Sequence, residues 1–364
     1  MLRAGLWSRD PECECFPLSR EVWEEIYVIA RKQTVEGIIY DGMMKLPANY
    51  LPPKELLLKW VVAINSIEGK NRRMNKVVGE LHKIFTKNHI AAFLMKGQGV
   101  AALYDNPLHR ICGDIDWAFP DKNNFDRAEQ LLKKNKVKIE KHVRSELFYV
   151  WKGFIVEHHR ELVNIDNPFL SKYLLHIQRQ EQVRTVYVDA DGQKIPLPSP
   201  MLTHLSVNAH ILKHLLSFGI AIRQLCDSAR TCCMYHQEIE GERLKETYCK
   251  LGIYRWIQLL NRLLVDYLGM PEEYLPFPLV YRQKADFMMQ DILRGGSFGF
   301  YGDAVSMKKD GMGAFIKYVL IRRPLRIIRY ICYAPGEAFW SPVMEGCSHI
   351  FGLISAKLGR SQRD

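Results

Sequence analysis

The spacing of apolar residues predicts helices at both ends of the chain and strands between them. In residues 1–89 the apolar positions recur three or four apart, as in Val22, Ile26 and Ile29, and Ser19 is placed to cap the first such stretch. Prolines at 47, 52 and 53 interrupt this pattern. Beyond them we predict a helix from about residue 54 and a separate helix that carries the apolar positions between 74 and 85.

Residues 90–200 carry strand-like patterns. Apolar runs at 90–95 and 112–119 predict two strands, separated by the break Lys96–Gly99 and a short helix at 100–104. Further strands are expected at 137–142, 146–151 and 154–159, the last two joined by a tight turn, and a hairpin is expected at 187–197. After Pro200 the helical patterns return as far as about residue 310.

These patterns define the expected organisation of the chain. We predict an α+β fold in which a small mixed sheet is flanked by helical segments. Its parts are an N-terminal helical segment (1–89), an α/β core (90–200), a C-terminal helical domain (201–310) and a basic tail (311–364).

The charge of the chain favours anionic partners. The formal charge is +11 and the pI is near 9.1, which attracts nucleic acid, nucleotide phosphates and anionic membranes alike. In the tail, Arg322, Arg323, Arg326 and Arg329 lie among apolar residues. This stretch could contact an anionic surface or pack its apolar side on the domain, and we favour packing.

We expect neither export nor membrane insertion from the sequence. Residues 1–16 have no apolar core of a signal peptide, and no stretch reaches the roughly 18–20 apolar residues of a membrane span. The nine cysteines are odd in number and include no Cys-x-x-Cys pair, so we expect free thiols. We therefore expect a cytoplasmic protein without a transmembrane segment.

The candidate chemistry begins with two aspartates in the second predicted strand. Asp114 and Asp116 are two residues apart, so their side chains share one face of a strand, about 7 Å from each other. A divalent cation relieves the repulsion between such carboxylates, and Mg²⁺ prefers oxygen ligands. Glu157 and His159 share a face of a later strand, which makes Glu157 the candidate third acid. Two exposed acids on an edge strand are the alternative interpretation of the aspartate pair.

The break before these acids suits a phosphate group. A strand ends at Lys96–Gly97 and a short helix follows, so backbone N–H groups near Gly97 and Gln98 are placed to face an anion, and glycine allows its close approach. Lys96 and Arg110 are candidates to neutralise phosphate charge. A salt bridge at the surface or at the edge of the core would explain either residue equally well.

Together these motifs resemble those of the DNA polymerase β-like nucleotidyltransferase superfamily, and within it a bacterial, Bacteroidetes-type family of uncharacterised nucleotidyltransferases. The matching segments are Leu94–Gly97, Arg110–Asp116, Val156–His159 and, more weakly, Arg223–Asp227. The portion from Lys-Gly to Asp-x-Asp is the specific one. Gln98 stands where the superfamily often has serine, and Glu157 stands where aspartate is common.

The resemblance implies a polymerase β-like sheet core and transfer of a nucleoside monophosphate from a triphosphate, such as ATP, to a hydroxyl group, with release of pyrophosphate. Asp114 and Asp116 would hold Mg²⁺ or Mn²⁺ on the triphosphate, and Glu157 would join the metal nearest the acceptor. The acceptor would be a small molecule, RNA or a protein. Two alternatives stay open: an inactive relative that binds RNA or protein, and a toxin-like enzyme that modifies tRNA or a protein.

Two further motifs have simpler explanations. His210 and His214 are four apart on a predicted helix, but Ile211 stands where a zinc protease needs glutamate, so we interpret them as ordinary helix residues. Asp189 and Asp191 form a second Asp-x-Asp, which turn chemistry beside a glycine explains.

Overall fold

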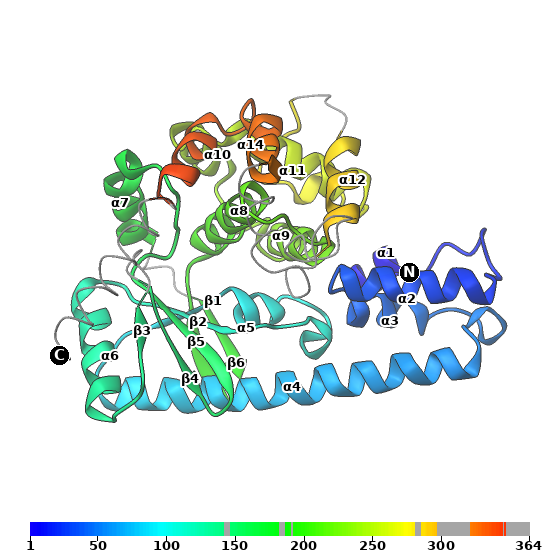
Figure 1. The fold of residues 1–364 in the computed structure, drawn as a ribbon, viewed down its shortest axis with the longest axis horizontal. Helices are drawn as coiled ribbons and strands as arrows, with labels where there is room; N and C mark the ends of the chain where they lie inside the picture. Colours follow the sequence, from blue (N-terminus) through cyan, green and yellow to red (C-terminus); the bar gives the residue numbers. More distant parts are fainter. Residues whose placement is uncertain are drawn as a thin grey trace.

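The sheet lies between one long helix and a layer of helices from the second half of the chain (Figure 1). The computed structural model describes residues 1–141, 146–181, 186–190, 192–280, 285–296, 321–344 and 346. A small mixed sheet between helical segments confirms the predicted α+β class. Within the described ranges, no helix is both long enough and apolar enough to cross a membrane.

The N-terminal segment begins with three helices, of which the third is buried along most of its length. They are α1 (Leu2–Leu6), α2 (Arg20–Lys32) and α3 (Glu36–Met43). The hydroxyl of Ser19 accepts a hydrogen bond from the backbone N–H of Val22 at 3.4 Å, which confirms the predicted cap.

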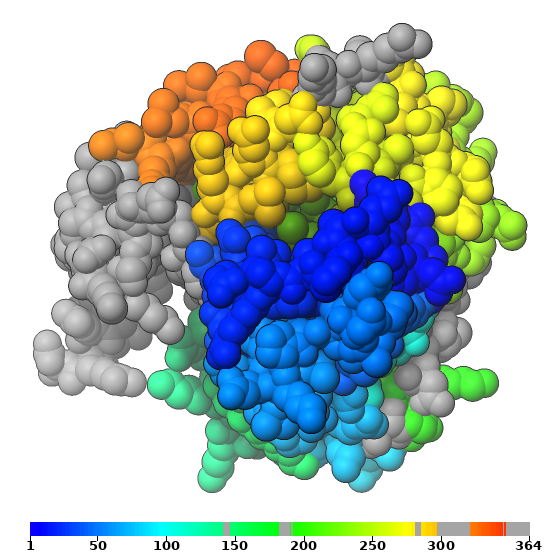
Figure 2. All heavy atoms as spheres, turned by 90° about the vertical axis from the view of Figure 1, so that its right-hand side faces the viewer, coloured from blue at the N-terminus to red at the C-terminus, as the bar shows by residue number. Residues whose placement is uncertain are grey.

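These helices pack against the helices near residues 250–290. The indole N–H of Trp7 donates to the carbonyl of Leu268 at 2.6 Å, and the amide of Gln33 donates to the carbonyl of Ile292 at 3.0 Å. Figure 2 shows the N-terminal segment, in dark blue, between the start of the long helix and the yellow helices. The beginning of the chain and its C-terminal helices therefore share one hydrophobic core.

The predicted division of residues 54–85 into two helices is wrong, because a single helix of 34 residues, α4, runs over Lys54–Lys87. No proline interrupts it. Gly69 lies within it, and a glycine there costs roughly 1 kcal/mol relative to alanine but removes no backbone hydrogen bond. Trp60 packs in the core of the N-terminal helices, whereas Phe85 packs under the sheet. One helix thus supports both hydrophobic clusters.

Short strands form a sheet in the order β1-β2-β5-β4-β3. Their bounds are β1 (Phe93–Met95), β2 (Ile115–Ala118), β3 (Glu140–Lys141), β4 (Leu147–Trp151) and β5 (Phe154–His159). β2 and β5 are parallel, and the other neighbouring pairs are antiparallel. The strands predicted at 112–119 and 137–142 are therefore shorter than expected, and residue 142 lies outside the described ranges.

Two hairpins follow the predicted pattern. Lys152 and Gly153, between β4 and β5, have φ of 49° and 84°, as a two-residue hairpin turn requires. The second hairpin pairs β6 (Val186–Ala190) with β7 (Gln193–Leu197). Asp191, of the second Asp-x-Asp, lies outside the described residues.

Further helices lie beside the sheet or belong to the second half of the chain. They are α5 (Lys96–Ala101), α6 (Lys122–Lys134), α7 (Ser171–Glu181), α8 (Pro200–Leu216), α9 (Ile222–Tyr235), α10 (Gly241–Lys250), α11 (Tyr254–Asp266), α12 (Asp286–Gly295) and α14 (Arg323–Tyr330). The short helix predicted at 100–104 lies earlier in the chain, because α5 starts at Lys96, is kinked at Gly97 (φ 8°, ψ −107°) and ends at Ala101.

The basic stretch packs on the domain by one face. The hydroxyl of Tyr330 donates to Asp291 of α12 at 3.2 Å, and Arg326 lies 3.6 Å from the same carboxylate. Leu325 and Ile328, on the other face of α14, are 60% and 67% exposed. The packing favoured from the sequence therefore covers only part of this helix.

Candidate active site

Two parallel strands bring predicted acids together. β2 and β5 pair so that Asp116 lies opposite Glu157, and His159 follows two residues later on the same face. Ligand atoms of these three residues all lie within 4.8 Å of one another. Asp114 directly precedes β2 and is not one of this close group, although its charge acts on both acids. We call Asp114, Asp116 and Glu157 the acid cluster.

Asp116 is the most buried member of the acid cluster and is only 3% exposed. Its Oδ1 lies 3.1 Å from Nζ of Lys96 and 2.8 Å from Nε2 of His159. Burial would raise the pKa of Asp116, but the Lys96 ammonium and the His159 hydrogen bond hold that pKa well below its ordinary value. Asp116 is therefore ionised at neutral pH.

The other two acids are held in a setting that opposes their negative charge. Burial, followed by the charges of Asp116 and Asp114, raises the pKa of Glu157 to about 7. Repulsion from Asp116, followed by burial, raises the pKa of Asp114. A positive ion next to these carboxylates would favour their ionised forms, so the cluster is an attractive place for a cation.

His159 lies between two carboxylates. Its Nε2 faces Asp116, and its Nδ1 lies 3.4 Å from Oε1 of Glu146. Burial and Lys96 act to lower the pKa of His159, but the hydrogen bonds to Asp116 and Glu146 outweigh them and raise it. Although burial opposes it, the contact with His159 lowers the pKa of Glu146 to about 2. The hydrogen bond from His159 fixes the orientation of the Asp116 carboxylate.

Helix α8 contributes groups that the sequence did not place at the site. A small cavity beside the acid cluster is lined by Lys96, Glu146 and His159 on one side and by His210 and Lys213 of α8 on the other. Burial, with the nearby Lys96 charge, lowers the pKa of His210 well below its ordinary value, so His210 is neutral. The expectation that His210 is an ordinary helix residue therefore missed its position beside the acids.

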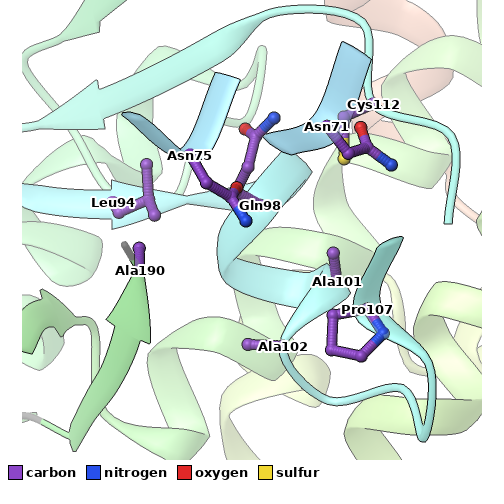
Figure 3. Close-up of a pocket in the computed structure, with 9 residues that line it drawn as sticks. All are labelled: Asn71, Asn75, Leu94, Gln98, Ala101, Ala102, Pro107, Cys112 and Ala190. Atoms are coloured by element: carbon purple, nitrogen blue, oxygen red, sulfur yellow. The ribbon is translucent and has the colours of Figure 1, made fainter. Parts of the chain in front are cut away.

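The turn at the start of α5 contacts the backbone that leads into β2. Lys96 has a φ of 44°, and a Cβ added to Gly97 would lie 3.1 Å from the carbonyl oxygen of Asp114. The turn thus carries the Lys96 side chain to Asp116 while its backbone packs on Asp114. Gln98 lines a different cavity, together with residues of α4 (Figure 3). Its side chain is therefore not among the groups around the acids.

Arg110 is directed away from the acid cluster. Its guanidinium donates to both carboxylate oxygens of Asp227, at 3.0 and 2.6 Å, and the hydroxyl of Tyr104 donates to the same carboxylate at 2.7 Å. Arg110 is 4% exposed and Asp227 is 5% exposed. Of the two roles considered from the sequence, the structure gives Arg110 the salt bridge, at a buried position between β2 and α9.

The donors of the acid cluster fit a divalent cation. Carboxylate oxygens suit Mg²⁺ and Mn²⁺, whereas imidazole suits zinc and the later transition metals. Both nitrogens of His159 already face carboxylates, so Asp114, Asp116 and Glu157 offer the oxygen donors of the site. Lys96 lies beside these donors and partly balances their charge.

The raised pKa of Glu157 predicts how stability depends on pH when no divalent cation is present. In an unfolded chain a glutamate loses its proton near pH 4.3, whereas Glu157 in the folded protein does so near pH 7. Its contribution favours folding below the unfolded pKa and is lost as the pH rises to about 7. We expect Glu157→Gln to raise the melting temperature in EDTA, and to raise it more at pH 8 than at pH 5. An equal shift at both pH values would contradict the assignment.

No curated protein matches the chain. An antigenic nucleotidyltransferase-like protein from Paracoccidioides brasiliensis, known from a crystal structure, is 16% identical with a TM-score of 0.34, over 54% of this chain and 92% of that chain. The sequence profile of a family described as uncharacterised nucleotidyltransferase matches residues 19–269, which is more than half of the chain. The chain therefore belongs to this family of uncharacterised nucleotidyltransferases, as its motifs predicted.

Proposed function

We propose that the protein transfers a nucleoside monophosphate from a nucleoside triphosphate to a hydroxyl group in a metal-dependent reaction. The observation that carries the proposal is the pairing of Asp116 with Glu157 across two parallel strands, with Asp114 beside them. The adjoining cavity adds Lys96 and Lys213, whose charges suit a polyphosphate.

Asp114, Asp116 and Glu157 would hold Mg²⁺ or Mn²⁺. When bound, such a cation supplies charge stabilisation for phosphate oxygens. His159 keeps the Asp116 carboxylate oriented through its hydrogen bond, and its contact with Glu146 keeps the imidazole in place. These contacts allow the acids to be organised before any substrate binds.

The residues around the acids suit each part of the transfer. Lys96 and Lys213 are placed to neutralise phosphate charge beside the cluster. The acceptor oxygen attacks the α-phosphorus, the bond between that phosphorus and the oxygen bridging to the β-phosphate breaks, and pyrophosphate leaves. Glu157, at the acceptor side of the cluster, is the candidate for the base that takes the acceptor proton.

The alternative of an inactive relative that only binds RNA or protein is less well supported. The pKa values of Glu157 and Asp114 are both raised, so the three clustered acids resist ionisation unless a cation is bound next to them. A protein that only binds RNA or another protein does not need such a cluster. A toxin-like enzyme that modifies tRNA or a protein would use the same cluster, and it differs from the main proposal only in its acceptor.

The test is transfer of label from each nucleoside triphosphate in turn, ATP, CTP, GTP and UTP, with Mg²⁺ or Mn²⁺ and a cell lysate as the source of acceptors. We expect label from the α-phosphate to appear on an acceptor, and label from the γ-phosphate to appear only in pyrophosphate. Separation of the products into small molecules, RNA and protein identifies the acceptor class.

A matched variant in this assay is Lys213→Met, which keeps the length of the side chain and removes its charge. We expect it to raise the KM for the triphosphate at least tenfold, or about 1.4 kcal/mol, because the variant lacks the ammonium that would face the polyphosphate.

Transfer of the γ-phosphate, or no transfer with any nucleotide and either metal, would contradict the proposed reaction.

A further inference from the structure

Helix α14 carries an exposed row of aliphatic side chains. Leu325 and Ile328 are three residues apart, so they share one face of the helix, and they are 60% and 67% exposed. Ile321, four residues before Leu325, is 52% exposed and extends that face. Tyr330 lies on the opposite side of the helix, where it is fully buried and donates to Asp291. We call Ile321, Leu325 and Ile328 the apolar face of α14.

A row of arginines runs alongside this apolar face. Arg322, Arg326 and Arg329 each follow one of its members by one position, so they lie about 100° further round the helix. Residues 321–331 include no acid. Arg326 and Arg329 share the carboxylate of Asp291, at 3.6 and 3.3 Å. Two guanidinium groups on one carboxylate leave a net positive charge among these three groups.

The apolar face lies at the edge of the molecule and away from the acid cluster. Figure 1 shows α14 and α4 on opposite sides of the sheet, and Figure 2 shows the α14 segment in orange at the outer edge. Arg326 donates to the carbonyl of Leu215, near the end of α8, at 3.4 Å. Because α8 also lines the cavity beside the acids, it lies between α14 and the acid cluster.

The chemistry of this surface matches an anionic lipid bilayer. Aliphatic side chains enter the boundary between lipid headgroups and acyl chains, and neighbouring arginines are attracted to the headgroup phosphates. The aliphatic stem of an arginine stays in the apolar layer while its guanidinium reaches the phosphates. Single-stranded nucleic acid would instead favour aromatic side chains, on which bases stack. The apolar face of α14 consists of leucine and isoleucine only.

We propose that α14 docks the protein on membranes that contain anionic phospholipids. The apolar face enters the headgroup region, and Arg329, whose side chain is 52% exposed, contacts lipid phosphates. With eight residues, α14 lies in the plane of the surface and is too short to cross it. This inference goes beyond the proposed transfer reaction and requires neither the acid cluster nor a nucleotide.

Co-sedimentation of the full chain with vesicles tests the proposal. Vesicles of equimolar phosphatidylglycerol and phosphatidylcholine are compared with vesicles of phosphatidylcholine alone. We expect roughly tenfold or more tighter binding to the mixed vesicles, and a loss of that preference at high salt, because salt screens the arginine charges. Equal binding to the two kinds of vesicle, or no binding to either, would overturn the proposal.

Variants locate the contact with the vesicles. Leu325→Gln with Ile328→Gln makes the apolar face polar and should weaken binding to the mixed vesicles roughly tenfold or more. Its matched control is Val150→Gln with Ile155→Gln, a cross-strand pair that is 65% and 51% exposed and lies away from α14 (Figure 1). The control should bind like the wild type. Arg329→Gln should weaken binding and reduce its dependence on salt.

Further measurements separate lipid binding from other uses of this surface. Circular dichroism and melting curves show which variants are folded, and Ile321→Gln replaces the double variant if it is not. Equal losses in the apolar-face variant and its control would overturn the site. A wild-type dimer that binds no vesicles and dissociates in the apolar-face variant would assign the face to a second copy. Binding of single-stranded RNA in place of vesicles would assign the arginines to nucleic acid. None of these variants alters the acid cluster, so the transfer assay is unaffected by the outcome.

Discussion

Asp116→Asn is expected to reduce nucleotidyl transfer by about 10³-fold, the upper range for loss of one preorganised electrostatic group. Asp116 is the acid that Lys96 and His159 both contact, and it is the one held ionised. Asparagine keeps the shape of the side chain but cannot carry the charge that a divalent cation needs. Single-turnover transfer from the preferred triphosphate measures the loss.

Asp116→Asn and Asp114→Asn are expected to change the melting temperature in opposite directions. In EDTA, Asp116→Asn should lower the melting temperature, because Lys96 and His159 lose their shared counter-charge. Asp114→Asn should raise it, because repulsion from Asp116 is the largest cause of the raised pKa of Asp114. Both variants should lose the thermal shift produced by Mg²⁺ with a triphosphate. A wild-type shift in the double variant would place the nucleotide elsewhere.

Gly97→Val is expected to weaken triphosphate affinity tenfold or more, or about 1.4 kcal/mol. We propose that a phosphate approaches the turn at Gly97, and any side chain there would obstruct it. The added Cβ would also lie 3.1 Å from the carbonyl oxygen of Asp114, so it would displace the segment that leads to the acids. Titration with a non-hydrolysable triphosphate in the presence of Mg²⁺ measures the effect.

Gln98→Ala is the comparison for Gly97→Val. The side chain of Gln98 lines a cavity on the α4 side of α5, so this substitution should weaken triphosphate binding far less. Circular dichroism shows whether Gly97→Val is folded. A folded Gly97→Val protein with wild-type affinity would show that the phosphate does not bind at the turn. Equal losses in the two variants would show that α5 acts as a whole and not through its first turn.

Alternation along strands made much of the site predictable. It placed Glu157 and His159 on one face of β5, and that face lies beside Asp116. The position of Glu146 could also have been predicted from strand alternation. A two-residue turn at Lys152–Gly153 sets the register of β4 and β5, pairs Leu147 with His158, and so leaves Glu146 next to His159.

The contributions of distant helices could not be predicted in the same way. Lys213 and His210 reach the site because α8 packs over the sheet, and no local pattern encodes that packing. For Arg110 the distant contact removes a predicted role. An arginine close to an acid motif suggests phosphate binding, but in the structure its guanidinium donates to Asp227, more than 100 residues later. The unbroken α4 was missed because the apolar positions between 74 and 85 were assigned to a separate helix, although no proline lies between them and the helix that starts at Lys54.

The buried Arg110–Asp227 pair also restricts the routes by which this sequence can evolve. Loss of one partner from such a pair costs about 3–5 kcal/mol, a large share of the roughly 5–15 kcal/mol that stabilises a typical domain. Exchange of both partners for apolar residues of similar volume is often neutral or stabilising. A lineage that abandons the pair must therefore pass through a poorly folded intermediate or change both positions together, although neither side chain is directed at the acid cluster.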